Sequence, residues 1–462
     1  MAEVHRYRKE RDPSENLEWS IPNSQHIALS VIWLLELYPP SHSIDLMRDL
    51  RQAGWRSDFG RFNLLEWITA GRERSGTGAW ANLGVAMRPG KQTPFITSNY
   101  LLTQLPQSVD RALIDLTLLS QGLTVLRVGF VITDTASQSI EAAARAVYPT
   151  RFRPVGAGLE ESTPQFRKQE AASVAMDIIR DQCTVWMRKK FHGVFAGGLL
   201  DGLYPSVALL ATSGIAAFDQ ESPPLRFLRI LGLDHTFEAW EADELTGLRA
   251  TWGEWLHKRR PEFVLAVRRE EAAPAQWITG MGGSIESLAW RVHDQFRSLM
   301  PIWAARHLVI GYQVRLARAR DRLTPTGNGL TDRRSALEAV HRSIVIPGFD
   351  VRLVAGELVG LVDEKNWLMR EIPKLHPLDP SLWSKPASLG ELWIDRLVQA
   401  ARDVLSREED LRQLHVLWST TEGGLANLRL QKRITFLTWV LVAFTFALTV
   451  IGVLSYASLA PR

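Results

Sequence analysis

The sequence predicts an α+β protein with a polar N-terminal tail, residues 1–20, and three further parts. Residues 21–275 alternate apolar runs of strand length with segments of helical period, which predicts a cytosolic α/β domain built as a two-layer sandwich. Residues 284–432 carry long helical patterns, which predict antiparallel helices forming a stalk. Residues 434–456 contain no charged side chain, which predicts a single C-terminal transmembrane helix.

Strands of the sandwich are predicted where short apolar runs are bounded by turn residues. Residues 27–37 indicate a buried strand, and residues 114–119 and 123–132 flank Gln121-Gly122, a pair typical of a hairpin because glycine tolerates positive φ. Further strands are predicted at 83–87, 207–212, 225–231 and 263–268.

Helices of the same domain are predicted from their start and stop signals. Ser43 caps a helix that Gly54 ends. Residues 139–147 form a second helix, stopped at Pro149. Thr163-Pro164 is the strongest start signal of the chain, because a capping hydroxyl precedes a proline in the first helical position.

The stalk is predicted as helices over 284–322, over 331–371 with a break at Pro347-Gly348, and from 389 onward. The last helix has heptad spacing, with one column formed by Leu397, Val404, Leu411, Trp418 and Leu425. Arg407 and Thr421 interrupt the neighbouring column. Two interpretations stay open: an intermolecular coiled coil that makes a homo-oligomer, and an amphipathic helix packed on its neighbours within one chain.

The predicted transmembrane helix has membrane-typical flanks. Its 434–456 stretch would be roughly 35 Å long at about 1.5 Å per residue, enough to cross a lipid bilayer. Trp439 and Tyr456 lie near its ends, and Lys432 and Arg433 precede it, so the N-terminal side is expected in the cytoplasm. The pattern predicts a tail-anchored, single-pass protein of the inner cell membrane. The alternative is a buried core helix.

A stripe of small and hydroxyl residues follows one face of this helix: Thr438, Thr445, Thr449 and Gly452. Such residues let helices approach closely and hydrogen-bond in lipid, so we expect the stripe to pack against another copy of the chain. The alternative is that the hydroxyls bond back to carbonyl groups of their own helix.

The composition does not indicate a reaction. The chain has 462 residues, a net charge of +4 and one cysteine, Cys183, which excludes a disulfide framework and a thiolate metal cluster. No catalytic, cofactor-binding or metal-binding residue is predicted, and the cofactor stays unknown. Asp115 lies in the predicted hairpin, where turn and cap roles are commoner than catalysis, and His293-Asp294 is interpreted as a surface polar pair.

A basic face is predicted at the end of the first stalk helix and just after it. It consists of Arg315, Arg318, Arg322, Arg333 and Arg334. It could contact lipid headgroups, nucleic acid or an acidic protein, or simply face solvent. Nucleic acid is not favoured, because aromatic residues that would stack on bases are missing from this stretch.

A cytosolic α/β domain followed by antiparallel helices and a stalk helix entering the membrane resembles the layout of CorA-type divalent-cation transporters. The resemblance spans residues 284–456 and concerns architecture. The family's Gly-Met-Asn loop is absent, because Val450-Ile451-Gly452-Val453 continues the apolar run, and the second span is absent too. The resemblance implies a relative that kept the scaffold and lost or delegated conduction, and it transfers no functional residue.

Three functions are compatible with these patterns. The leading hypothesis is a non-enzymatic, oligomeric membrane protein whose cytosolic domain binds a ligand or a protein partner, as a sensor or scaffold. The second is a CorA-like ion transport protein assembled from several single spans. The third is a membrane-tethered enzyme with a dispersed site, which a pocket of acidic and histidine side chains with shifted pKa values would favour.

Overall fold

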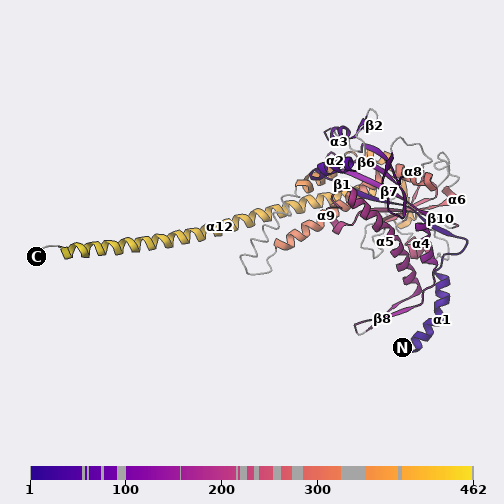
Figure 1. Ribbon diagram of the computed structural model, residues 1–462, viewed down its shortest axis with the longest axis horizontal. Helices are drawn as coiled ribbons and strands as arrows, with labels where there is room; N and C mark the ends of the chain where they lie inside the picture. The colour runs from indigo at the N-terminus through magenta and orange to yellow at the C-terminus, as the bar shows by residue number, and fades with distance from the viewer. Residues whose placement is uncertain are drawn as a thin grey trace. The chain divides into compact units, whose positions relative to one another are not determined.

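The computed structural model describes residues 2–54, 58–59, 62–73, 78–90, 100–156, 158–214, 217–218, 226–233, 239–252, 262–272, 285–323, 349–382 and 388–459. The chain forms two compact units (Figure 1). The first comprises Met1–Gln313 with Asp350–Leu405, and the second comprises Val314–Phe349 with Ser406–Arg462.

The first unit is built around a mixed β-sheet, to which ten strands belong in the described part of the chain. Their order is β14-β11-β12-β13-β10-β1-β7-β6-β4-β5. The central strand β1 runs antiparallel to both β7 and β10, whereas β10 and β13 are parallel. The bounds are β1 His26–Tyr38, β4 Trp80–Met87, β5 Tyr100–Leu102, β6 Val109–Leu118, β7 Thr124–Ile132, β10 Ser206–Ser213, β11 Trp240–Ala242, β12 Leu248–Trp252, β13 Glu262–Arg268 and β14 Leu375–Pro377.

Two short ribbons lie outside this sheet. They are β2 Asp58–Phe59 paired with β3 Phe62–Asn63, and β8 Arg151–Val155 paired with β9 Gly158–Ser162. The helices not named below are α1 Ala2–Glu18, α6 Arg269–Ala272, α11 Lys365–Glu371, η1 Pro40–His42, η2 Leu199–Gly202 and η5 Pro380–Leu382.

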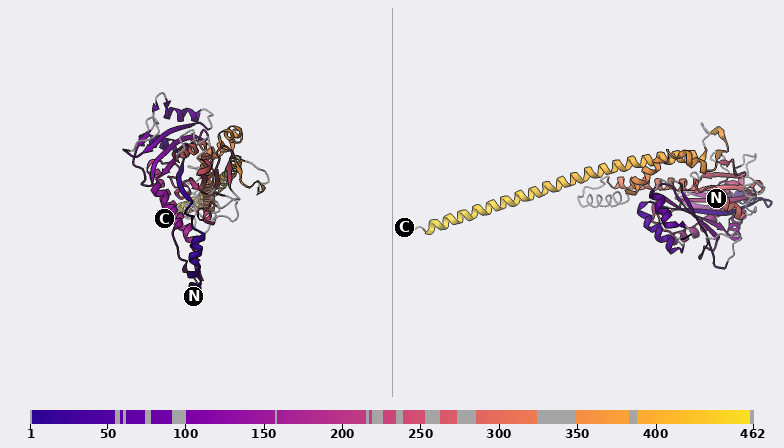
Figure 2. Two further views of the ribbon diagram at one scale, coloured as in Figure 1. Left: turned by 90° about the vertical axis from the view of Figure 1, so that its right-hand side faces the viewer. Right: turned by 90° about the horizontal axis from the view of Figure 1, so that it is seen from above.

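Helices cover both faces of the sheet, so the first unit has three layers (Figure 2). One face carries α2 Ser43–Gln52, α3 Leu64–Glu73, α4 Asp134–Arg145 and α5 Pro164–Lys190, and Phe130 of β7 meets Trp186 of α5 with ring centroids 5.5 Å apart. The other face carries α8 Ile285–Gln295 and the first part of α9 Leu299–Leu323. The predicted two-layer sandwich is therefore wrong. In the observed sheet, the central strand β1 is buried on both faces, which agrees with its continuous apolar run.

Two segments differ from their predicted form. Residues 225–231 were expected as a strand, but the 3₁₀ helix η3, Arg226–Leu231, lies there, since periodicity cannot distinguish a short apolar run in a strand from a buried helical turn. The helix expected over 284–322 is divided into α8 and α9. Pro301 lies in the first turn of α9, where its missing N–H costs no helical hydrogen bond.

Helix α12, Leu389–Leu459, begins in the first unit and continues in the second. In the predicted heptad column, Leu397, Val404 and Leu411 are buried. In the neighbouring column Leu414 is 40% and Leu428 56% exposed. Self-association through α12 stays a prediction, and Trp418 and Leu425 lie outside the described side chains.

The predicted membrane anchor is overturned: within the described residues, no helix combines the length and the apolar character needed to cross a membrane. Lys432 and Arg433 immediately precede Ile434, and the described side chains of α12 end at Thr445. The predictions of a transmembrane helix over 434–456, of a tail-anchored single-pass topology and of inner-membrane localisation are corrected accordingly.

The residues assigned to that anchor have other surroundings. Trp439, Lys432 and Arg433 are exposed side chains of α12, and Tyr456 lies outside the described side chains. The hydroxyl groups of Thr438 and Thr445 each donate at 2.8 Å to carbonyls of their own helix, at Ile434 and Leu441. The other stripe residues, Thr449 and Gly452, lie outside the described side chains.

Gly129 offers a test of how closely β7 and β1 pack. A Cβ atom at this position would lie 2.5 Å from Nε1 and 2.7 Å from Cδ1 of the buried Trp33 ring. We expect Gly129→Ala to lower the free energy of unfolding by about 1–3 kcal/mol, because the indole must shift in a close-packed core. Urea denaturation measures it. Gly356→Ala is the control, since no atom lies within 4 Å there, and an equal loss in both variants would contradict the prediction.

Candidate functional site

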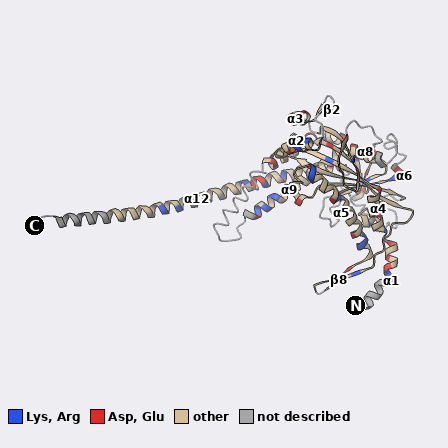
Figure 3. Ribbon diagram, in the orientation of Figure 1, with Lys and Arg blue, Asp and Glu red and all other residues tan. Residues whose placement is uncertain are grey.

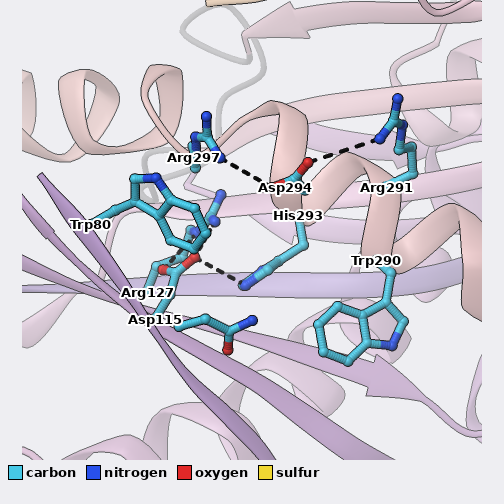
Figure 4. A pocket seen from close by; sticks show the side chains of 9 residues that line it. Trp80, Asp115, Arg127, Trp290, Arg291, His293, Asp294 and Arg297 are labelled. Atoms are coloured by element: carbon cyan, nitrogen blue, oxygen red, sulfur yellow. Dashed lines mark hydrogen bonds and ion pairs between the residues drawn. The ribbon is translucent and has the colours of Figure 1, made fainter. Parts of the chain in front are cut away.

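A pocket of about 170 Å³ lies in the first unit, where β4, β6 and β7 meet α8 and the turn that follows it (Figure 4). Buried polar groups form its floor, and two tryptophans and two arginines form its walls and rim. The lining residues are Trp80, Asn82, Asp115, Arg127, Trp290, Arg291, His293, Asp294 and Arg297.

The floor is a buried ion pair between neighbouring strands. Asp115 of β6 lies directly opposite Arg127 of β7 in the ladder. Arg127 Nε donates to Asp115 Oδ1 at 3.1 Å, and Arg127 Nη2 donates to Oδ2. With Arg127 1% and Asp115 3% exposed, each charge is compensated by a two-pronged pair rather than by water.

His293 of α8 completes this network. Its Nε2 lies 3.0 Å from Asp115 Oδ2, and Trp33 Nε1 of β1 lies 3.0 Å from its Nδ1. An indole N–H can only donate, so Nδ1 must accept and the single proton of the neutral ring belongs on Nε2, facing the carboxylate. Both ring nitrogens are therefore occupied, and His293 fastens α8 to β1 and β6.

The shifts in pKa agree with this protonation pattern. Burial alone would raise the pKa of Asp115, but the charge of Arg127 and the hydrogen bonds from His293 and Arg127 outweigh it and hold this pKa well below its usual range. Burial lowers the pKa of His293, and the nearby Arg127 charge lowers it further. At neutral pH the floor is an ionised aspartate, a charged arginine and a neutral histidine.

The walls are aromatic, and the rim is charged. The Arg297 guanidinium lies 4.6 Å from the centre of the Trp80 ring, a cation–π arrangement, and Arg297 Nη2 also pairs with Glu371 at 2.7 Å. The Trp290 ring meets His293 edge-on, with centroids 6.3 Å apart. Arg291 Nη1 lies 3.9 Å from Asp294.

A β-bulge shapes the strand that carries Trp80. The register of β4 against β6 shifts between Asn82 and Gly84, and Asn82 Oδ1 accepts the N–H of Gly84 at 2.7 Å. Gly84 has φ +103°, a conformation that suits glycine. Bulges commonly redirect side chains beside functional sites, and this one lies at the pocket wall.

The arrangement is suited to binding rather than to proton transfer. His293 has no free nitrogen to act as a base, and Asp115 is held as an anion by Arg127 and His293. In the part of the chain that the structure describes, no group of three or more His, Cys, Asp or Glu side chains is placed to hold a metal ion.

Sequence reasoning noticed two residues of this site and misjudged both. His293 is buried at 3% exposure, so its interpretation as part of a surface pair is wrong, and Asp115 serves no turn or cap. Arg127, Trp33 and Trp80 were missed. A signal existed for Arg127, because a lone arginine within the apolar run 123–132 needs a buried partner.

Neither Arg315 nor Arg318, the described side chains of the predicted basic face, is among the residues that line the pocket. Arg315 is half-buried and Arg318 exposed, and both belong to the part of α9 in the second unit. Figure 3 marks the Lys and Arg residues of α9 in blue. The side chain of Arg322 and residues Arg333 and Arg334 lie outside what the structure describes.

Comparison of the chain with protein-family models, curated proteins and solved structures finds no match. The resemblance to CorA-type transporters stays a prediction.

The buried ion pair predicts a strongly non-additive response to mutation. Arg127→Met leaves the Asp115 carboxylate buried without its cation and should lower the free energy of unfolding by about 3–5 kcal/mol. Asp115→Ala should cost a similar amount, and the double variant clearly less than the sum, because no lone charge remains. Chemical denaturation measures all three.

The matched control for this cycle is the exposed pair Arg320–Asp321, whose side chains are 66% and 67% exposed. Arg320→Ala should change stability by less than about 1 kcal/mol. Additive losses at Asp115 and Arg127 would show that the pair is not a buried unit.

Proposed function

We propose that this chain is a non-enzymatic binding protein whose first unit holds a small planar ligand between Trp80 and Trp290. The observation that carries this proposal is the full use of the polar groups on the pocket floor. Trp33 and Asp115 form hydrogen bonds with the two ring nitrogens of His293, and Arg127 forms an ion pair with Asp115. A ligand would meet a neutralised, rigid floor and two indole rings.

The size of the pocket supports a ligand of about one ring. A dry cavity of about 150 Å³ in another protein accepts benzene, and this pocket has about 170 Å³. Indole walls offer large, rigid contact areas for a planar molecule.

The rim supports a ligand with an acceptor or a negative charge. Arg291 and Arg297 both line the pocket. A guanidinium group can donate two parallel N–H bonds to a carboxylate, so a ligand carboxylate fits this rim.

An enzyme with a dispersed site is the second candidate. The convergence of Asp115 and His293 with shifted pKa values in one pocket favours it. The pairing of their polar atoms with each other, with Arg127 and with Trp33 opposes it, because acid–base catalysis needs a group free to exchange a proton with a substrate. Conversion of a bound compound during prolonged NMR observation would support the enzyme.

Binding of single-ring probes tests the leading proposal. We expect benzoate to bind the full chain more tightly than benzyl alcohol in saturation-transfer NMR and calorimetry. Trp290→Ala should weaken benzoate binding about two- to tenfold, because an aromatic pair is worth roughly 0.5–1.5 kcal/mol. Trp439→Ala, an exposed tryptophan of α12, is the control and should leave binding unchanged. Failure of both probes to bind, or equal binding by Trp290→Ala, would contradict the proposal.

A further inference from the structure

Two carboxylates pair with the arginines at the rim of the pocket. Arg297, in the turn after α8, donates from Nη2 to Glu371 Oε2 of α11 at 2.7 Å and from Nη1 to Asp294 Oδ1 at 3.3 Å. Asp294 also lies 3.9 Å from Arg291, the second arginine of the rim (Figure 4). Among these four side chains, two positive charges are therefore balanced by two negative ones.

The floor of the pocket is balanced in the same way, because Arg127 pairs with Asp115. A ligand with a carboxylate group would bring one further negative charge to a site whose charges already cancel. Like charges placed close together oppose binding. An anionic ligand therefore binds best if one of the two rim carboxylates moves away from its arginine.

Glu371 is the carboxylate that can move away. Asp294 pairs with both Arg291 and Arg297, so its departure would leave two cations without it. Glu371 comes from a different element, 74 positions from Arg297 in the chain, and is not among the residues that line the pocket. Its side chain is 34% exposed, so water can solvate it once it leaves Arg297.

Helix α11 has other contacts that hold it in place when this ion pair opens. A Cβ atom at Gly78, two positions before Trp80, would lie 2.0 Å from Cη2 of Trp367, so the Trp367 ring packs on the start of β4. Lys365 Nζ, at the other end of α11, lies 3.1 Å from Glu391 of α12. A change in the Glu371 side chain alone is therefore enough to release Arg297.

We propose that Glu371 is a built-in competitor for the anionic group of the ligand: it pairs with Arg297 in the free protein, and a ligand carboxylate replaces it there. This inference rests on the proposed function and adds the residue that limits affinity for anions. A neutral ring of the same size would bind between Trp80 and Trp290 without displacing Glu371. The Glu371 charge therefore controls selectivity between charged and neutral ligands.

Calorimetry of the full chain with benzoate and benzyl alcohol tests the competitor. Glu371→Gln keeps the size of the side chain and removes its charge. It should tighten benzoate binding about two- to fivefold, the range expected for loss of a partly exposed ion pair, and leave benzyl alcohol binding unchanged. Glu391→Gln is the matched control, because it removes an equal charge beside Lys365 and should leave the binding of both compounds unchanged.

A double-variant cycle separates direct competition from a general effect of charge. Arg297→Met should weaken benzoate binding, and adding Glu371→Gln to it should give no gain, because the competitor then has no guanidinium to occupy. The same two- to fivefold gain in the presence and absence of Arg297 would overturn the proposal.

The failure of the competitor and the failure of the proposed function give different results. Benzoate binding that is equally tight in the natural protein and in Glu371→Gln would overturn the competitor while agreeing with the proposed function. Absence of benzoate binding from both proteins would overturn the proposed function, and the competitor with it.

Discussion

The positive charge of Arg127 in the middle of the sheet is the constraint from which the surroundings of the pocket follow. A buried guanidinium needs an anion, and Asp115 provides it from the neighbouring strand. The second carboxylate oxygen then needs a further donor, which His293 supplies from α8, and the remaining nitrogen of His293 needs the indole of Trp33. This chain of requirements fixes the position of α8 on the sheet and leaves the pocket above a rigid floor.

The buried carboxylates on the two faces of the sheet, Asp115 and Glu36, have different surroundings. On the Trp33 side, Asp115 is matched by a cation and stays ionised. On the other side, Glu36 has no cation beside it among the described residues: burial raises its pKa to about 7, and hydrogen bonds from backbone N–H groups and Tyr204 lower it in part. The first carboxylate is held by an ion pair, and the second by backbone and hydroxyl donors.

Short-range patterns in the sequence, such as turn residues and helix start signals, predicted individual elements correctly. The hairpin around Gln121-Gly122 is present as β6 and β7, and the Thr163-Pro164 signal begins α5. The sheet order was not accessible, because it pairs strands far apart in the chain, such as β1 with β10. The pocket depends on the same long-range pairing: Trp33 and His293 are 260 positions apart, and no local pattern reports their contact. The membrane prediction rested on the uncharged C-terminal run, but no helix of the described residues is long and apolar enough to cross a membrane.

The tautomer of His293 tests the central claim most directly, because the binding function rests on a histidine with no free nitrogen. Two-bond ¹H–¹⁵N correlation spectra of the full chain, with His293→Gln to assign the signal among the 11 histidines, report which nitrogen carries the proton. The account predicts a ring that is neutral at pH 7, carries its proton on Nε2 and has a pKa below the ordinary value of 6.5. A ring protonated on Nδ1, or an imidazolium already present at pH 7, would contradict it and return His293 to the list of acid–base catalysts.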